Sequence, residues 1–126
     1  MIRMYKILGF ISLLLGVACA SEPVKQRLEY PPVVTFESPE TGSEYEVGDE
    51  ITFVGNVFDD NQSSDTLQIV WNSDKDSILS EEPASADGVV TFTTSSLSAA
   101  THIIMITAID DEQASAQDWI QIEIFD

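Results

Sequence analysis

The chain has 126 residues, of which 22 are acidic and five are basic, so its formal net charge at pH 7 is −17. A chain this acidic repels the phosphates of nucleic acids and the anionic surface of a bilayer, which argues against binding to either through surface charge. The length leaves room for one domain of about 100 residues beside a short leader.

Residues 1–18 have the pattern of a secretory signal. Arg3 and Lys6 precede an apolar run at 7–17, and Ala18 follows the run as a small exit residue. The run is shorter than the roughly 20 residues that a helix needs to cross a bilayer. We therefore predict a cleaved signal peptide at residues 1–18 rather than a permanent transmembrane anchor.

The only cysteine, Cys19, directly follows this signal, and a single cysteine cannot form an intramolecular disulfide. Residues 14–19, Leu-Leu-Gly-Val-Ala-Cys, resemble the lipobox of bacterial lipoproteins. The resemblance implies cleavage before Cys19, acylation of its thiol, and stable membrane attachment by two or three acyl chains. Because Ala20 rather than Asp follows the cysteine, it also implies sorting to the outer membrane in a diderm bacterium. The alternative is ordinary secretory cleavage beside an incidental thiol.

Residues 19–32 are polar, end in Pro31-Pro32 and lack apolar periodicity, so we predict a lipidated tether of up to about 40 Å. From residue 33 onward, apolar and polar residues alternate in short runs that turn residues separate. The predicted strands are 33–37, 51–58, 67–72, 89–93, 102–109 and 119–125, with turns at Thr41-Gly42-Ser43 and Gly48-Asp49 and a hairpin-like signal at Asp87-Gly88. This pattern predicts an all-β domain at residues 33–126, an antiparallel β-sandwich of about seven strands.

Four stretches of the predicted domain carry a recognisable arrangement. They are Ser38-Pro39 through Gly42-Ser43 to Ile51; Val57-Phe58-Asp59-Asp60 followed by Leu67 to Trp71; Leu97 to His102 followed by Ile104, Ile106, Ala108 and Asp110; and Asp118 to Ile124. The arrangement resembles bacterial immunoglobulin-like and PKD-type (polycystic-kidney-disease) domains. Ala100 replaces a usual glycine and Asn72-Ser73 replaces the Phe-Gly-Asp-Gly run of PKD modules, so the broader immunoglobulin-like label fits better. The resemblance implies a spacer, an adhesion module or a binding platform, because a fold alone does not supply a function.

Two conspicuous side chains have structural interpretations. His102 is the only histidine, and the sequence has neither a nucleophile motif beside it nor the further ligands that zinc requires. We predict that it makes a structural hydrogen bond, where related sandwiches keep a corner tyrosine. Trp71 alternates in phase with Leu67 and Ile69, which predicts a core tryptophan. The sequence therefore predicts a domain without enzymatic activity.

The last two predicted strands are expected to be neighbours, and their alternation predicts an apolar patch on the outer face. If Ile120, Ile122 and Ile124 face the core, Trp119 faces outward, and if Ile104 and Ile106 face the core, Ile103 and Met105 face outward. Together with Val70, these residues form an exposed patch, unless the tether or a loop covers it. The candidate partner-binding residues are Ile103, Met105 and Trp119.

Two acidic groups, at residues 59–61 and 110–112, are expected in loops that this fold brings to one end. Hard oxygen ligands in number are what Ca²⁺ requires. The interpretations are solvated loop acids or a calcium site. The candidate calcium ligands are Asp59, Asp60, Asn61, Asp110 and Asp111.

The sequence thus predicts a non-enzymatic cell-envelope lipoprotein that presents one immunoglobulin-like binding or structural module. The expected partners are the membrane, through the lipid on Cys19, and another envelope protein or a glycan, with no nucleic acid. The alternative is a calcium-dependent adhesion or glycan-binding module that uses the acidic end loops.

Overall fold

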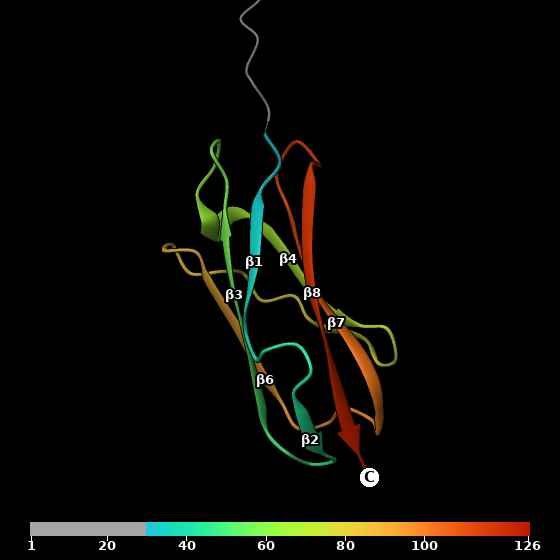
Figure 1. Cartoon of the computed structure of the whole chain (residues 1–126). Coiled ribbons are helices and arrows are strands. Elements are labelled where there is room, and N and C mark those ends of the chain that lie inside the picture. The colour runs from blue at the N-terminus through green and yellow to red at the C-terminus, as the bar shows by residue number, and fades with distance from the viewer. Residues whose placement is uncertain (1–29) are drawn as a thin grey trace, which may run out of the picture.

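The computed structural model describes residues 30–126, drawn in colour in Figure 1. The predicted signal peptide at 1–18, the lipidation site Cys19 and the tether up to residue 29 lie outside the described residues. The elements are β1 (Val33–Ser38), β2 (Glu44–Glu46), β3 (Ile51–Phe58), the 3-10 turn η1 (Ser64–Thr66), β4 (Gln68–Ser73), β5 (Ser77–Ser80), β6 (Val89–Thr94), β7 (Ala100–Ile109) and β8 (Ser115–Phe125).

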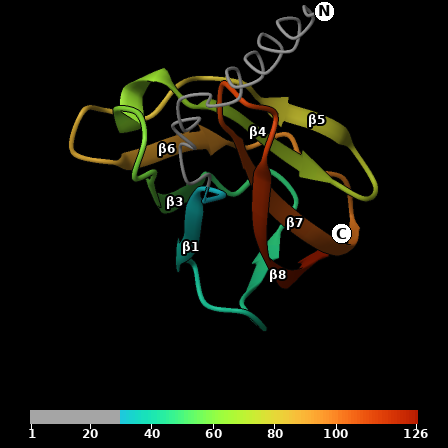
Figure 2. The same cartoon turned by 90° about the horizontal axis from the view of Figure 1, so that it is seen from above.

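The strands form two sheets that pack face to face, as the view in Figure 2 shows. One sheet has the order β1-β3-β6, and the other has the order β2-β8-β7-β4-β5. All neighbouring pairs are antiparallel except β2 and β8. The predicted all-β sandwich is confirmed, with eight strands because the short β2 and β5 add to the six predicted ones. Between residues 30 and 126, no helix is long and apolar enough to span a membrane.

The chain changes sheets just after β1, at the cis peptide between Ser38 and Pro39. The predicted turn at residues 41–43 follows, and β2 then pairs with β8 in parallel. The backbone N–H of Gly42 donates to the carbonyl of Gln121 over 2.7 Å, and the N–H of Glu123 donates to the carbonyl of Ser43 over 3.0 Å. The segment from β1 to β2 therefore contributes one strand to each of the two sheets.

The space between the sheets holds a cluster of four aromatic rings. The ring of Trp71 lies 5.3 Å from that of Phe36 and 5.1 Å from that of Phe92, and the rings of Phe53 and Phe92 stack at 4.9 Å. Trp71 and Phe53 are completely buried. The predicted core role of Trp71 is confirmed, and edge and stacked contacts of this kind stabilise a core beyond the buried area alone.

Asp87-Gly88 forms a turn, but the hairpin that it suggested is wrong. β5, before the turn, lies in the five-stranded sheet, whereas β6, after it, lies in the three-stranded sheet. The turn closes where the N–H of Gly88 donates to the carbonyl of Ser85 over 2.9 Å. A Cβ at Gly88 would lie 2.5 Å from the carbonyl oxygen of Val57, so the crossing chain packs closely against β3.

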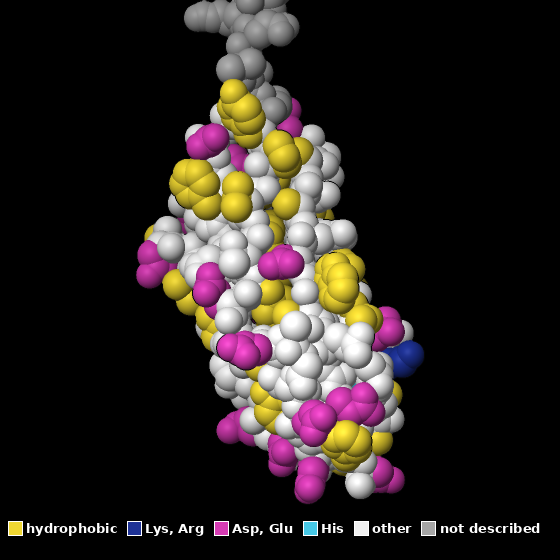
Figure 3. Space-filling model, in the orientation of Figure 1, with side chains coloured by type: hydrophobic (Ala, Val, Ile, Leu, Met, Phe, Trp, Pro, Cys, Tyr) yellow, Lys and Arg dark blue, Asp and Glu magenta, His cyan; other side chains and the backbone are white. Residues whose placement is uncertain are grey.

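Charge is distributed unevenly over the fold. All but two of the 22 acidic residues lie within residues 30–126, against one cation there, Lys75. The five strands β3 to β7 carry no Asp, Glu, Lys or Arg, so the acids gather in the loops and on β1, β2 and β8. Figure 3 shows acidic side chains most densely at the lower end of the molecule, with single ones scattered over its middle and upper parts. Both outer sheet faces are therefore mostly uncharged.

Candidate functional site

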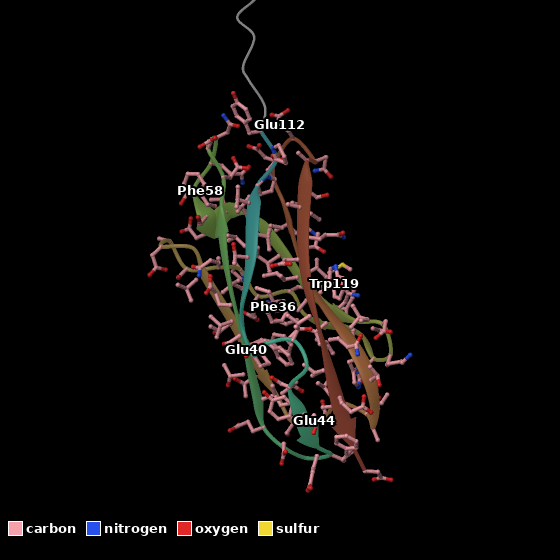
Figure 4. The ribbon with its side chains drawn as sticks, in the orientation of Figure 1. Phe36, Glu40, Glu44, Phe58, Glu112 and Trp119 are labelled. Atoms are coloured by element: carbon pink, nitrogen blue, oxygen red, sulfur yellow. The ribbon has the colours of Figure 1, made fainter. Side chains whose placement is uncertain are left out.

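Trp119 lies on the outer face of the five-stranded sheet, in a row of residues that crosses four strands. It is opposite Met105 on β7, which is opposite Asn72 on β4, which in turn is opposite Ile78 on β5. Trp119 is 55% exposed and Ile78 is 59% exposed, and Met105 between them is half-buried. Figure 4 shows Trp119 on the side of β8 away from β1. We call Trp119, Met105, Ile78 and the half-buried Ile103 the Trp119 face.

The predicted phase of the last two strands is confirmed. The residues predicted to face inward are all buried: Ile104, Ile106, Ala108, Ile120, Ile122 and Ile124. Trp119 consequently faces solvent. Within residues 30–126, neither a loop nor the end of the tether covers its side chain. Val70 is half-buried, opposite Thr107 on the same face, so it extends the patch only partly.

The residue before Trp119 holds β8 against the opposite sheet. Asp118 lies on the inward phase of β8, and its Oδ2 accepts a hydrogen bond of 2.8 Å from the backbone N–H of Phe36 on β1. Its Oδ1 lies 2.9 Å from the N–H of Trp119. Asp118 therefore joins the two sheets, at a part of β8 beyond its pairing with β2, which covers only Glu123–Phe125. Inward-pointing charges at unpaired strand positions discourage the addition of another strand.

The buried Ser73 and His102 and the half-buried Asp76 form an arrangement that resembles a catalytic triad, which no sequence motif indicates. The Ser73 Oγ lies 2.7 Å from Nδ1 of His102, and Oδ2 of Asp76 lies 3.8 Å from Nε2. However, the carbonyl of Ser98 can only accept, so Nε2, 2.8 Å away, carries the ring proton. The predicted structural hydrogen bond of His102 is therefore confirmed.

The hydroxyl of Ser73 is not available as a nucleophile. It accepts hydrogen bonds from the backbone N–H groups of Lys75 and Asp76, at 2.9 and 3.2 Å, and its own proton points to His102. Both Ser73 and His102 are buried, and His102 has no exposed surface at all. Every hydrogen-bonding position of this group is thus used to join the turn after β4 to the start of β7.

Two carboxylates of the turn after β4, those of Asp74 and Asp76, also bond to backbone N–H groups in or just before β7. A hydrogen bond from the N–H of Ile103 lowers the pKa of Asp74 from its ordinary value of 3.8. Burial opposes the ionisation of Asp76, but the N–H and hydroxyl of Ser98, at 2.9 and 2.8 Å, outweigh it and lower the pKa of that carboxyl also. Ionised Asp74 and Asp76 therefore stabilise the folded state.

The two acidic loops do lie together at one end of the sandwich. Asp59 follows β3 and Asp110 follows β7, and both side chains are buried. The loops are joined because the N–H of Asp111 donates to Oε1 of Gln62 over 2.8 Å. Each buried carboxylate also holds its own loop, since Oδ1 of Asp59 accepts from the Asn61 N–H. Oδ1 of Asp110 accepts from the N–H groups of Glu112 and Ala114.

Among the residues that the structure describes, no three His, Cys, Asp or Glu side chains lie close enough together to hold a metal ion, at this end or elsewhere. Asp60 and Asp111 are exposed. One atom remains unexplained, because Oδ2 of Asp59 is buried and has no hydrogen-bond partner. The calcium site over Asp59, Asp60, Asn61, Asp110 and Asp111 stays a prediction.

A second outer-face feature was not anticipated from the sequence. An open depression of about 440 Å³ lies on the three-stranded sheet beside the start of β1. Its lining includes Phe58, which is 56% exposed at the end of β3 and which Figure 4 shows on the side of β1 away from β8. The alternation of residues in β3 predicts that Phe58 faces outward. It does not predict that loop residues 62–64 and 86–87 lie around Phe58.

No family model matches the chain, and no curated protein matches it either. Among solved structures, the chain is similar to the fibronectin(III)-like modules of CbhA from Clostridium thermocellum, at 15% identity and a TM-score of 0.63. That match covers 79% of this chain and 49% of that chain. An endo-beta-1,4-mannanase from Thermotoga petrophila matches at 14% identity and a TM-score of 0.59, over 77% of this chain and 20% of the mannanase.

Titin M4 matches at 16% identity with a TM-score of 0.55, over 78% of this chain and 99% of that one. The chain therefore spans about half the length of the CbhA chain, a fifth of the mannanase and nearly all of the titin domain. At these identities the similarity concerns the fold alone. Residues 33–126 form an all-β, two-sheet sandwich of the immunoglobulin and fibronectin(III) type.

Proposed function

We propose that the chain is a non-enzymatic cell-envelope lipoprotein, anchored through Cys19, whose immunoglobulin-like domain docks another envelope protein on the Trp119 face. The observation that carries the docking role is the exposure of Trp119 in register with Met105 and Ile78 on a neutral sheet face. Exposed apolar patches that contain a tryptophan are typical of protein interfaces, where such side chains contribute much of the binding energy.

The charge distribution supports a docking role for this face. Because the acids lie mainly in the loops, a partner can approach the Trp119 face without meeting a row of carboxylates. Loop acids at both ends repel a second copy of this strongly acidic chain, which favours a different protein as the partner. The anchor rests on the lipobox resemblance of residues 14–19.

The absence of activity is part of the proposal and is supported by the Ser73–His102 group. A nucleophile must reach a substrate, and the Ser73 hydroxyl is buried with its lone pairs already occupied. The similar solved structures include fibronectin(III)-like and titin modules, and the mannanase match covers only a fraction of that enzyme.

Site-directed photo-cross-linking in the native envelope tests the docking role. A photoreactive residue at Ile78, on the Trp119 face, is expected to give one cross-linked product that a Trp119→Ala variant lacks. The matched control is Thr52, which is exposed on the outer face of the other sheet. Equal products from Ile78 and Thr52, or a product that does not depend on Trp119, would contradict the proposal.

A second candidate function, calcium-dependent adhesion through the end loops, is favoured by one atom, the buried and unpaired Oδ2 of Asp59. A cation that binds only the folded state would raise the melting temperature. An unchanged melting temperature between millimolar calcium and chelator, at fixed ionic strength, would remove this candidate.

A further inference from the structure

The depression beside Phe58 is built on two neighbouring rows of paired residues of β1 and β3. Thr35 is opposite Asn56, and in the next row Val33 is opposite Phe58. Its volume of about 440 Å³ falls within the range of small-molecule sites, roughly 300–1,000 Å³. The depression lies on the opposite outer face from Trp119.

Several polar groups of the depression are not used by the fold. Within residues 30–126, the Asn56 amide and the Thr35 hydroxyl make no side-chain hydrogen bond, although Asn56 is half-buried. By contrast, the Gln62 amide already bonds within the protein. Its Nε2 donates to Thr66, and its Oε1 accepts from the N–H of Asp111. The depression therefore offers a free amide donor and acceptor and a free hydroxyl.

Asp87 adds a carboxylate at the rim. Its Oδ1 accepts from the Ser85 hydroxyl and from the Val89 N–H, which leaves Oδ2 as an acceptor for a ligand. The close packing of Gly88 against the Val57 carbonyl fixes this turn beside Phe58. Asp87 is the only ionisable residue of the lining, and the lining contains no cation. The site accordingly disfavours anionic ligands and does not require a charged one.

An exposed aromatic ring beside unpaired amide, hydroxyl and carboxylate groups suits one class of ligand. The electron-rich face of the Phe58 ring attracts the C–H groups on the apolar face of a pyranose, and the sugar hydroxyls both donate and accept. We propose that this depression binds an uncharged saccharide, with a sugar ring stacked on Phe58 and hydroxyls bonded to Asn56 and Asp87.

An apolar side chain of a protein partner fits the same space less well. It would cover the half-buried Asn56 amide and Oδ2 of Asp87 without replacing the water that they bind, and an unpaired buried polar group costs about 1–3 kcal/mol. A saccharide replaces those waters with its own hydroxyls. The free polar groups thus favour a glycan over an apolar peptide at this position.

Amide chemical-shift mapping of the purified full chain tests the proposal. The probes are maltohexaose, cellohexaose and mannohexaose as neutral oligosaccharides, with trigalacturonate as the anionic comparison. At least one neutral probe should shift the amides of Asn56, Phe58 and Gly88. Phe58→Ala and Asn56→Ala should each weaken its binding at least tenfold, whereas Phe125→Ala, which removes an exposed ring at the far end of β8, should not.

Three results would overturn the inference. They are the absence of any shift up to 10 mM of every neutral probe, shifts confined to residues away from the depression, and unchanged affinity in both Phe58→Ala and Asn56→Ala. Thermal unfolding of each variant separates a lost site from a lost fold, and Asn56→Ala retains the exposed Phe58 ring if Phe58→Ala fails to fold. Because Trp119 lies on the other sheet, Trp119→Ala should bind the glycan normally whatever the fate of the docking proposal.

Discussion

The backbone N–H of Phe36 donates a 2.8 Å hydrogen bond to the carboxylate of Asp118, across the gap between the two sheets. Phe36 belongs to the aromatic cluster around Trp71, and Asp118 directly precedes the exposed Trp119. One bond therefore connects the residue before the outward-facing tryptophan to the aromatic cluster of the core. A rigid support of this kind limits the entropy lost when a surface residue binds a partner.

Replacing Asp118 with Ala should leave the Phe36 N–H without its partner and destabilise the fold by about 1–2 kcal/mol. Asp118→Asn keeps a side-chain oxygen that can accept the same bond, so it should cost less than half as much. Urea unfolding of the two variants measures the difference. Equal losses in both would show that the carboxylate's charge, not the bond to Phe36, is what matters.

A comparison of Gly88 with Gly42 separates two contributions to the unfolding free energy. One is the close approach of Gly88 to the Val57 backbone, and the other is the positive φ that both glycines adopt. Both have φ of +92°, but a Cβ would meet nothing within 4 Å at Gly42 and would lie 2.5 Å from the Val57 carbonyl oxygen at Gly88. Gly42→Ala should therefore cost about 1–2 kcal/mol, from the left-handed backbone alone. Gly88→Ala should cost at least about 2 kcal/mol more, because backbone must move. Similar unfolding free energies for the two variants would contradict the close packing of Gly88 against the Val57 carbonyl.

The lowered pKa values of Asp74 and Asp76 predict a definite acid response. A carboxyl whose pKa is lower in the folded state contributes stability that is fully present above the unfolded value, near 3.8, and is lost as the pH falls through the folded value. The unfolding free energy should thus begin to fall near pH 4. Asp76→Asn should reduce the slope of this fall, measured by urea unfolding at a series of pH values. A slope that Asp76→Asn leaves unchanged would show that Asp76 is not responsible.

The strands that follow a local rule were predictable from the sequence, and the contacts between distant segments were not. The alternation of Ile104 and Ile106, and of Ile120 and Ile122, correctly predicted which sides of β7 and β8 are buried. β2 escaped notice because it is three residues long, carries two glutamates and exists only through parallel pairing with the far end of the chain. The pattern around Asp87-Gly88 identified a turn, but periodicity cannot say that its flanking strands join different sheets.

The same limit applies to the sites. Trp119 was found because period two fixes the direction of its side chain once its neighbours are assigned to the core. The depression at Phe58 depends on loops 62–64 and 86–87 meeting over β3, and no local pattern encodes that meeting. The Ser73–His102 bond joins residues 29 positions apart, so the sequence suggested a structural histidine without naming its partner.

The lipid anchor has its own test. If Cys19 is acylated, the wild-type protein should fractionate with membranes and begin at that cysteine after processing. Cys19→Ser should release the protein to the soluble fraction or leave the signal uncut. A Cys19→Ser protein that stays in the membrane fraction and is cut at the same bond would refute the lipoprotein assignment.

The central claim is that Trp119 serves binding rather than folding, and one comparison tests it most directly. For Trp119→Ala and wild type, the unfolding free energy and the affinity for the partner cross-linked through Ile78 are measured on the same preparations. Because Trp119 is more than half exposed, its loss should change stability by less than about 1 kcal/mol while weakening binding by about 2 kcal/mol or more, roughly thirtyfold. Severe destabilisation with no separate loss of binding would show instead that Trp119 is an ordinary part of the β-sandwich.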